Sequence, residues 1–220
     1  MTIEPVAFFR SPVKGKFGVP RQAGLVPSLE GEVRFVPPYD SPSAVKGLDG
    51  FDYCWLLWGF SLNPDSSDTL TVRPPRLGGN ERVGVFASRS PFRPNGLGLS
   101  CVRIESIEGG VLHVCGADLA DGTPVYDVKP YVAYSDSRPD AKSGFVDAVN
   151  WEKLSVEFLP EAAAVLDERQ RETVSGLLEL DPRPQYQADP ERVYGMFFES
   201  LDVKFKVDGK KVLVVSAEKY

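Results

Sequence analysis

The distribution of proline constrains the fold of this chain more than any other feature of its sequence. Fifteen of the 19 prolines lie before residue 140 of the 220-residue chain. Because proline locks φ and lacks a backbone N–H, it breaks helix interiors, so this region cannot be mainly helical. The residues between the prolines form short β-rich runs. Many short strands in close succession are typical of a β-barrel or a β-sandwich.

The β-rich runs and the turns between them predict the strands of the first part of the chain. We expect strands at Pro5–Phe9, Val33–Val36, Phe51–Leu62, Arg82–Ala87, Ser100–Ile107, Val111–Asp118 and Pro124–Val128. Gly109-Gly110 lies between two of these runs and predicts a tight hairpin turn.

The pattern changes after about residue 150. The expected elements are a strand at Trp151–Leu159, one amphipathic helix at Glu161–Leu180, and a terminal hairpin of Tyr194–Val207 and Lys210–Ala217 with a type I′ turn at Asp208-Gly209. We therefore predict a mainly β fold with some α. Residues 1–150 form a β-barrel body, and residues 151–220 form a small α+β C-terminal domain with one helix and the terminal hairpin.

Composition excludes several classes of protein. The longest nearly apolar run, Tyr53 to Phe60, is far shorter than the roughly 20 residues of a membrane span. The only histidine, His113, lies in a strand-like run, so a His-rich metal site is excluded and we expect no metal. The three cysteines lie among apolar residues without a CxxC pair, which favours reduced, buried thiols in the cytoplasm.

Charge is unevenly distributed along the chain, although the net charge of −6 argues against a non-specific nucleic-acid binder. Residues 10–22 and 73–95 together hold nine basic residues and one acid, whereas the rest of the chain holds 16 basic and 30 acidic residues. Any contact with a polyanion is therefore expected to be local.

The second basic segment has the composition of a ligand-binding site. Two stiff loops, at residues 73–80 and 89–100, combine Pro, Gly, Arg and Asn and flank the expected strand Arg82–Ala87. Proline fixes the path of a loop, glycine lets the backbone approach a ligand, and arginine binds carboxylate or phosphate with a planar fork. The chain contains neither G-x-G-x-x-G nor G-x-x-x-x-G-K-[ST], so a Rossmann or Walker nucleotide site is excluded.

A third segment, Asp118–Tyr131, concentrates aspartates around an expected strand–turn–strand unit. Asp121-Gly122 is typical of an ordinary hairpin turn, in which aspartate bonds its own backbone. Asp118, Asp121 and Asp127 could instead face one pocket, where carboxylates hold a cation or accept a proton.

These segments together resemble the TsaA-like, or TrmO, family. The resemblance is carried by Val19-Pro20-Arg21-Gln22, TVRPPRLGGN (71–80), VFASRSPFRPNGLGLS (85–100), Asp118–Tyr131 and Asp181-Pro182-Arg183-Pro184-Gln185-Tyr186, and it runs through nearly the whole chain. Two departures are visible: Gly96-Leu97-Gly98 stands where many relatives have Pro-Ile-Gly, and Ser61-Leu62 stands where some have a pair that contains histidine.

The resemblance implies an S-adenosyl-L-methionine-dependent tRNA methyltransferase with a barrel instead of a Rossmann fold. It implies methylation of N6 of threonylcarbamoyl-adenosine beside the anticodon of threonine tRNA, by a homodimer with its cofactor near the subunit interface. The cofactor contacts that it implies are Pro20, Arg21, Gln22, Ser61, Leu62, Arg89, Leu99, Asp121, Gly122, Thr123, Pro124 and Val125.

We assign roles to the remaining site residues from the chemistry of their side chains and from the reaction that the resemblance implies. We expect Asp121 or Asp127 to accept the proton of the target nitrogen, because that nitrogen is a poor nucleophile while it is protonated. We expect the nucleotide to be bound by Arg76, Phe92, Arg93, Asn95, Lys129, Arg183 and Tyr186. Phe92 could equally anchor its loop in the core, and Asp181-Pro182 could simply end the helix.

Two other functions remain open at this point. A non-catalytic RNA-binding barrel explains the arginines but leaves the aspartates unexplained, whereas a methyltransferase for another nucleoside or a small molecule fits the same residues. For the tRNA methyltransferase that the resemblance implies, the confined basic segments predict a local contact with RNA whose affinity depends only modestly on salt.

Overall fold

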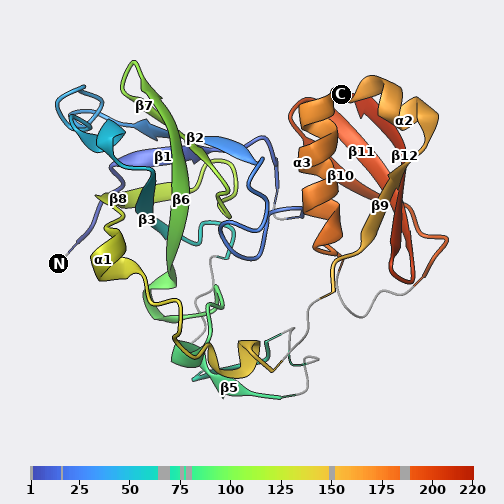
Figure 1. Cartoon of the computed structure of the whole chain (residues 1–220), viewed down its shortest axis with the longest axis horizontal. Coiled ribbons are helices and arrows are strands. Elements are labelled where there is room, and N and C mark those ends of the chain that lie inside the picture. The colour runs from blue at the N-terminus through green and yellow to red at the C-terminus, as the bar shows by residue number, and fades with distance from the viewer. Residues whose placement is uncertain are drawn as a thin grey trace.

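A computed structural model provides the structure of the chain and describes residues 2–15, 17–63, 70–74, 77, 81–148, 152–183 and 189–220. Figure 1 shows the strands of the first part on one side and a sheet with two helices on the other. None of the helices in these ranges is long and apolar enough to cross a membrane.

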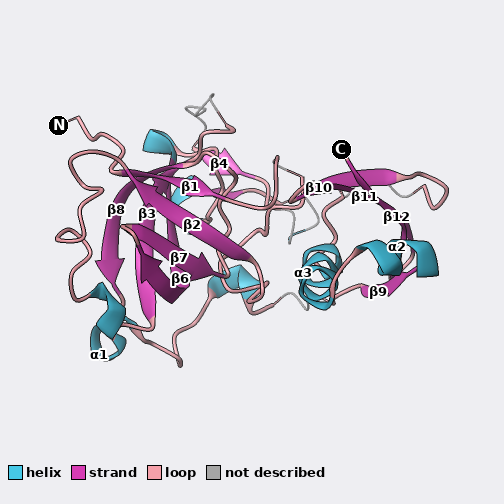
Figure 2. Cartoon of the chain, turned by 90° about the horizontal axis from the view of Figure 1, so that it is seen from above, coloured by secondary structure: helices cyan, strands magenta, loops and turns pink. Residues whose placement is uncertain are grey.

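Six strands close into an antiparallel barrel in the order β1-β2-β7-β6-β3-β8 (Figures 1 and 2). They are β1 (Ala7–Arg10), β2 (Glu30–Phe35), β3 (Tyr53–Gly59), β6 (Leu97–Glu108), β7 (Val111–Cys115) and β8 (Pro124–Pro130). The prediction of a mainly β, non-Rossmann fold is confirmed.

Alternation of buried and accessible residues explains the barrel strands. In β3, Cys54, Leu56 and Trp58 are buried, and the residues between them face outward. The turn between β6 and β7 contains Gly109 and Gly110 with φ of 57° and 81°, which is the backbone that a type I′ hairpin requires.

The predicted strand at Arg82–Ala87 is wrong. Only β5 (Val83–Gly84) is extended, and it pairs with β4 (Thr71–Val72). Because β4 offers only two residues for pairing, the chain then coils into a 3-10 helix at Val85–Ala87, and the backbone N–H of Ser88 donates to the carbonyl of Val85. The described residues form further short helical turns at Leu48–Gly50, at Pro94–Gly96, in α1 (Ala133–Asp136) and at Gly144–Val146.

The C-terminal part is a four-stranded sheet with two helices packed on it. The sheet order is β10-β11-β12-β9, with β9 parallel to β12. Its elements are β9 (Ser155–Phe158), α2 (Pro160–Val165), α3 (Glu168–Glu179), β10 (Tyr194–Phe198), β11 (Leu201–Asp208) and β12 (Lys211–Lys219).

The prediction of a single helix at Glu161–Leu180 is wrong, because the chain is extended at Leu166 between α2 and α3. Asp167 starts α3 with a capping box: its side chain accepts from the backbone N–H of Gln170, and the Gln170 side chain accepts from the backbone N–H of Asp167. Such a box satisfies N–H groups that a continuous helix would have satisfied internally.

The first strand of the expected terminal hairpin, Tyr194–Val207, is two strands in the structure, β10 and β11. A tight turn at Glu199, which has a φ of 54°, separates β10 from β11. In the turn between β11 and β12 only Gly209 of the two loop residues has positive φ, so the turn is not of type I′, which needs positive φ at both positions.

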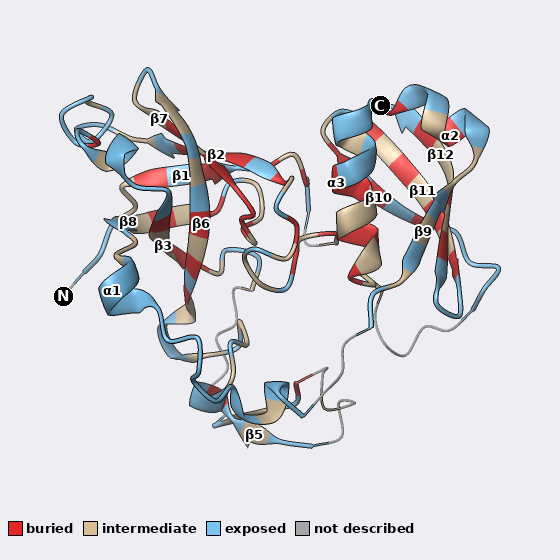
Figure 3. Ribbon diagram, in the orientation of Figure 1, coloured by how far each residue is buried: buried red, intermediate tan, exposed pale blue. Residues whose placement is uncertain are grey.

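Two buried clusters form the core (Figure 3). One fills the barrel, and the other joins α2, α3 and the C-terminal sheet. Val13, Val26 and Leu29, which lie between β1 and β2, belong to the second cluster. Figures 1 and 2 both place α3 on the side of the C-terminal sheet that faces the barrel. The division at residue 150 stays a prediction, since residues near the N-terminus contribute to the C-terminal core.

Trp58 fits the barrel only because residue 98 has no side chain. The two residues are partners in the register of β3 and β6, and a Cβ at Gly98 would lie 2.4 Å from Cε2 of Trp58. The indole is held in place by a hydrogen bond of 2.9 Å from its Nε1 to Oγ of Ser100.

Replacing Gly98 by alanine should therefore lower the free energy of unfolding by about 1–3 kcal/mol, the usual range for forcing extra atoms into a packed core. Urea unfolding monitored by circular dichroism would measure it. Gly84→Ala is the matched control, because nothing lies within 4 Å of a Cβ at that position. Equal stability of the two variants would contradict this steric explanation.

Candidate functional site

The N-terminal basic segment and the arginine-rich loop meet in space. Nη1 of Arg89 donates to Oε1 of Gln22 over 2.5 Å, although 67 residues separate them in the sequence. Pro20 is buried and fixes the start of the segment, while Arg89 is exposed. The structure thus brings together two of the segments in which cofactor contacts are expected.

Arg21 connects the same segment to the C-terminal part. Its Nη2 donates to the carbonyl of Asp181 over 3.1 Å. Asp181, with a φ of 48°, follows α3, and its carboxylate accepts from Nε and Nη2 of Arg183 over 2.8 and 2.9 Å. This hydrogen-bonded pair raises the pKa of the Arg183 guanidinium. In this structure the Arg183 side chain therefore binds a carboxylate of its own loop.

Asp121 lies in the turn that leads into β8 and is surrounded by groups from the N-terminal segment. Its Oδ1 accepts from the backbone N–H of Ser11 over 3.0 Å, and its Oδ2 lies 3.2 Å from Nζ of Lys14 and 4.0 Å from Nη1 of Arg10. Sequence reasoning noted these two cations only as part of the charge pattern. Arg10 ends β1 and Lys14 follows it, and β1 pairs with β8, so barrel closure places them here.

The residues after Asp121 form hydrogen bonds with β1 and so help to close the barrel. Gly122 donates its N–H to the carbonyl of Phe9, and the carbonyl of Thr123 accepts from the N–H of Phe9. Thr123 and Val125 are buried, and Gly122, with a φ of 78°, has open space where a Cβ would lie. Pro124 begins β8. Of this group, Gly122 leaves the most room for a ligand.

Asp127 and Leu99 share the outer face of the barrel. Both are partners of Leu57, from β8 and from β6, and Leu99 is 58% exposed. One step along, Lys129 is a partner of Trp55. Its Nζ lies 2.7 Å from Oδ2 of Asp127. The two carboxylates that we expected to accept a proton therefore belong to separate charge groups, Asp121 with Lys14 and Asp127 with Lys129.

The loop before β6 is held by its own arginine. Nη1 of Arg93 donates to the carbonyl of Ser88 over 2.9 Å, and Asn95 and Gly96 have φ of 65° and 56°. Proline could not adopt the φ of Gly96, so this path of the loop needs a residue other than proline at position 96. Phe92 is 44% exposed.

Ser61 and Leu62 follow β3 and lie beside this loop, because the N–H of Phe60 donates to the carbonyl of Gly96 over 2.8 Å. Both side chains are exposed. Arg76 and Tyr186 were also expected to bind the nucleotide, and both lie outside the described residues.

Asp118 was singled out in the sequence only as part of the aspartate cluster, and its contacts were missed. Its Oδ1 accepts from Oγ of Ser100 over 2.5 Å, and Ser100 in turn accepts from Trp58. Burial raises the pKa of the Asp118 carboxyl, while the hydrogen bond from Ser100, the backbone amides of Asp118 and Ala23, and the charge of Arg89 lower it in part. Gly98 is the register partner of Trp58, and Ser100 lies two residues further along the same strand, so the arrangement depends on strand register.

Two cysteines and the histidine have environments that do not favour nucleophilic or metal chemistry. Burial raises the pKa of the Cys54 thiol to about 12 and that of Cys115 to about 11, so both stay protonated and are poor nucleophiles. His113 is half-buried on β7 with its Nδ1 3.9 Å from Oε1 of Glu32. Within the described part of the chain, no three His, Cys, Asp or Glu side chains gather closely enough to hold a metal.

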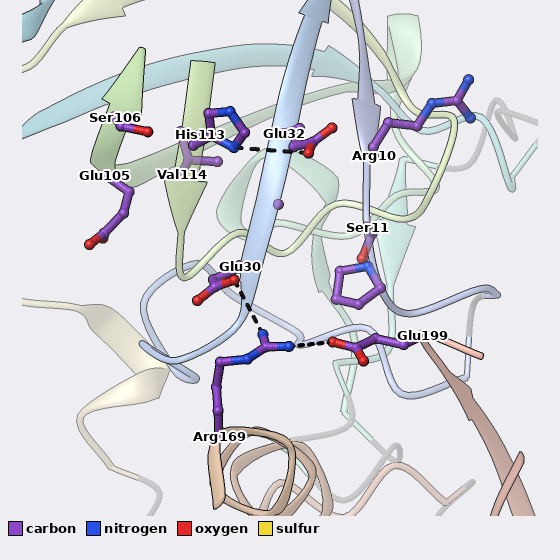
Figure 4. Close-up of a pocket in the computed structure, with 12 residues that line it drawn as sticks. Arg10, Ser11, Glu30, Glu32, Glu105, Ser106, His113, Val114, Arg169 and Glu199 are labelled. Atoms are coloured by element: carbon purple, nitrogen blue, oxygen red, sulfur yellow. Dashed lines mark hydrogen bonds and ion pairs between the residues drawn. The ribbon is translucent and has the colours of Figure 1, made fainter. Parts of the chain in front are cut away.

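A cavity of about 410 Å³ lies elsewhere, between the barrel and α3 (Figure 4). Glu30, Glu32, Glu105 and Glu199 line it, and Arg169 bridges Glu30 and Glu199. None of the residues that we expected in the site lines this cavity, although Arg10 and Ser11, which contact Asp121, do. Its carboxylates would repel the phosphates of a nucleic acid. We therefore take the surface around Gln22 and Arg89 as the candidate site, with Asp121 in a separate group beside the N-terminal segment.

The arrangement at that surface suits a ligand with both charges. Arg89 offers a guanidinium to a carboxylate, Gln22 offers an amide to a base edge, and the negative charge of Asp118 acts on Arg89. A sulfonium amino acid joined to a nucleoside carries all three complementary groups.

Comparison with known proteins agrees with this reading. Residues 8–137 match the model of the tRNA-methyltransferase O N-terminal domain, and residues 151–220 match the model of the TrmO C-terminal domain. A tRNA (adenine(37)-N6)-methyltransferase from Escherichia coli K12 is 38% identical over 93% of this chain and 92% of its own length. A Pseudomonas aeruginosa protein, provisionally named as the S-adenosylmethionine-dependent methyltransferase RcsF, is 42% identical over 92% of this chain and 90% of its own length.

The fold agrees as well. The crystal structure of TrmO from P. aeruginosa superposes with a TM-score of 0.83 at 34% identity, over 100% of this chain and 97% of that one. Since both family models and relatives of full length match, the chain belongs to the tRNA-methyltransferase O family.

Proposed function

We propose that this protein is a tRNA methyltransferase that transfers a methyl group from S-adenosyl-L-methionine to N6 of adenosine 37. The tRNA (adenine(37)-N6)-methyltransferases of E. coli and Eikenella corrodens, 38% and 45% identical to it, support the reaction, and the name of the P. aeruginosa relative supports the cofactor. The observation in the structure that carries the proposal is the contact between Gln22 and Arg89. A non-catalytic RNA-binding barrel is not favoured, because these relatives are named as enzymes.

The cofactor supplies an electrophilic methyl group on a sulfonium when it is bound. The residues that we propose to hold it are Pro20, Arg21, Gln22, Ser61, Leu62, Arg89, Leu99 and Asp121 to Val125. Because an in-line displacement needs little besides correct placement of the reactants, rigid loops are the main contribution of the protein. The Arg93–Ser88 hydrogen bond and the closure of the barrel by Gly122 and Thr123 give the site that rigidity.

The finer substrate that we propose is the threonylcarbamoyl form of adenosine 37 in threonine tRNA. Its carboxylate suits a guanidinium, and its base suits an exposed aromatic ring. Arg93, Asn95 and Phe92 lie on the loop before β6, and Lys129 lies on the outer face of β8. Arg76, Arg183 and Tyr186 complete the set proposed to bind the nucleotide.

The target nitrogen must lose a proton as the new N–C bond forms and the S–C bond breaks. We propose that the carboxylate of Asp121 or Asp127 accepts that proton. Asp127 is supported by its place on the same outer face as Leu99, and Asp121 by its position in the turn next to Gly122. Methyl transfer then leaves S-adenosylhomocysteine and a neutral methylated base.

A homodimer in the cytoplasm is the form in which we propose that the protein acts. Reduced cysteines suit that compartment, and all three are free. Leu99, Phe86 and Leu70 are 58%, 77% and 80% exposed, which is consistent with a surface that a second subunit covers.

Transfer of a labelled methyl group to total tRNA tests the substrate. We expect label in tRNA from cells that make threonylcarbamoyl-adenosine and none in tRNA from cells that lack this modification. Labelling of both pools would contradict the modified nucleoside as the substrate. Labelling of neither pool would contradict tRNA methylation itself.

Asp121→Asn and Asp127→Asn test the proton acceptor. The variant that loses the acceptor should lose about 100-fold or more in turnover at saturating cofactor, the usual contribution of general base catalysis. Asp127→Asn should keep its affinity for S-adenosylhomocysteine, whereas Asp121→Asn changes a residue that is also proposed to hold the cofactor. Calorimetry and single-turnover methylation measure the two quantities. Asp140→Asn, on an exposed loop, is the control. Unchanged turnover in both site variants would show that neither carboxylate is the acceptor.

A further inference from the structure

Three aromatic rings gather on the outer face of the barrel, where β3 and β8 pair. The ring centre of Tyr131 lies 6.1 Å from that of Tyr53 and 6.0 Å from that of Trp55, with interplanar angles of 64° and 44°. Aromatic rings at such distances attract each other beyond the effect of the area that they bury. We name these three residues the aromatic platform.

The platform is held in place by the short helix that follows β8. Nε1 of Trp55 donates to Oδ2 of Asp136 in α1 over 3.0 Å, and the same oxygen accepts from the backbone N–H of Val132 over 2.9 Å. The backbone N–H of Tyr131 donates to the carbonyl of Tyr53 over 2.9 Å. Figures 1 and 2 both place α1 beside the end of β8. The rings are therefore ordered before a ligand arrives, which lowers the entropy cost of binding.

The platform is accessible to solvent. Tyr53 is 43% exposed, and the other two rings are half-buried. The inward face of β3 is formed by Cys54, Leu56 and Trp58, so the platform occupies the opposite face. Within the described part of the chain, neither core cluster includes any of the three rings. A contiguous group of exposed rings that the core does not use is typical of a binding surface.

The same face of the barrel continues into the surface where methyl transfer is proposed. Leu57, two residues beyond Trp55 on β3, is the register partner of the proposed cofactor contact Leu99 and of the proposed proton acceptor Asp127. Side chains two residues apart on a strand share a face and lie about 7 Å apart. A polynucleotide with one base at Asp127 therefore has its neighbouring bases within reach of Trp55 and then of Tyr53.

The charges around the platform favour a nucleic acid over a second copy of the chain. Lys129 and Arg103 are the register partners of the two platform residues on β3. Nζ of Lys129 lies 2.7 Å from Oδ2 of Asp127, and Nη2 of Arg103 lies 2.6 Å from Oε2 of Glu105. Because exposed ion pairs contribute little to stability, each cation can turn to a phosphate at small cost. Charged residues are depleted at the centres of protein–protein interfaces.

We propose that the aromatic platform binds unpaired nucleotides of the tRNA by stacking on the bases that flank the methylated one. The inference rests on the proposed function and adds a binding surface to it. Every base has a π-face, so stacking tolerates any sequence and leaves the choice of nucleotide to the methyl-transfer site. Stacking also supplies affinity without charge, which suits a chain whose basic residues already bind partners within the fold.

Tyr53→Ala tests the proposal, because it removes the most exposed ring and leaves the hydrogen bond of Trp55 in place. We expect the dissociation constant for tRNA, measured by fluorescence anisotropy, to rise about fivefold or more, the lower end of the loss of one stacked base. The KM for tRNA should rise by a similar factor. The affinity for S-adenosylhomocysteine and the kcat at saturating tRNA should change by less than about twofold, because stacking on flanking bases is uniform binding. Tyr53→Phe keeps the ring and should bind tRNA as the wild type does.

Tyr39→Ala is the matched control. Tyr39 is 47% exposed and follows β2, which β7 and β6 separate from β3 in the barrel. Its removal should leave the affinity for tRNA unchanged. Heparin, a polyanion without bases, separates stacking from charge, and wild type and Tyr53→Ala should bind it equally. Equal losses of affinity for tRNA and heparin would overturn the proposal.

Sedimentation equilibrium of the same variants tests the other occupant. A dimer that Tyr53→Ala converts to a monomer would show that a second copy covers the platform, and the proposal would be wrong. Trp55→Leu serves if Tyr53→Ala does not fold, and wild-type affinity for tRNA in that variant would count against stacking. Wild-type protein that binds neither tRNA nor an adenosyl ligand would contradict the proposed function itself. Wild-type protein that binds tRNA, with a Tyr53→Ala variant that binds it equally well, would contradict this inference alone.

Discussion

Closure of the barrel between β1 and β8 is the constraint on which the site depends. The two strands share only the pairs Ala7–Val125 and Phe8–Pro124, and hydrogen bonds from Val6 and Phe9 to the carbonyls of Val125 and Thr123 extend the contact. Because β1 leads directly into the N-terminal basic segment, this closure brings Ser11 and Lys14 to Asp121. Residues more than one hundred positions apart become neighbours through a few backbone hydrogen bonds.

The basic segments identified in the sequence serve the fold as well as any ligand. Arg21 donates to the carbonyl of Asp181, Arg89 to Gln22, and Arg93 to the carbonyl of Ser88, while Lys14 pairs with Asp121. Each of these cations already has a partner within the chain. The density of positive charge therefore overstates the number of phosphates that this surface can contact, and much of the charge organises loops that lack regular secondary structure.

The sequence predicted the fold class well and several local details badly, for identifiable reasons. The β-rich, nearly apolar run at Phe51–Leu62 identifies β3, and Gly109-Gly110 identifies the turn that follows β6. The end of α2 was missed although Asp167 and Gln170 have the spacing of a capping box, because the apolar pattern continues across it. The turn at Glu199 carries no glycine or asparagine, so no local signal separates β10 from β11.

The candidate site was predictable only in part. The resemblance identified Gln22 and Arg89, but nothing in either segment indicates that the two side chains touch. The link from Trp58 through Ser100 to Asp118 depends on which residues face inward at one end of a closed barrel. That information resides in strand register, which the sequence specifies collectively and which no single motif reveals.

The N-terminal segment also completes the C-terminal sheet. Val13 forms a bridge with Phe198, the N–H of Lys14 donates to the carbonyl of Phe197, and the N–H of Glu199 donates to the carbonyl of Pro12. In terms of modularity, the two halves of this protein are not separable at any one point in the chain. A C-terminal half expressed alone would lack the backbone that covers β10 and would expose that edge, and an N-terminal half alone would leave Val13 and Val26 without their packing partners.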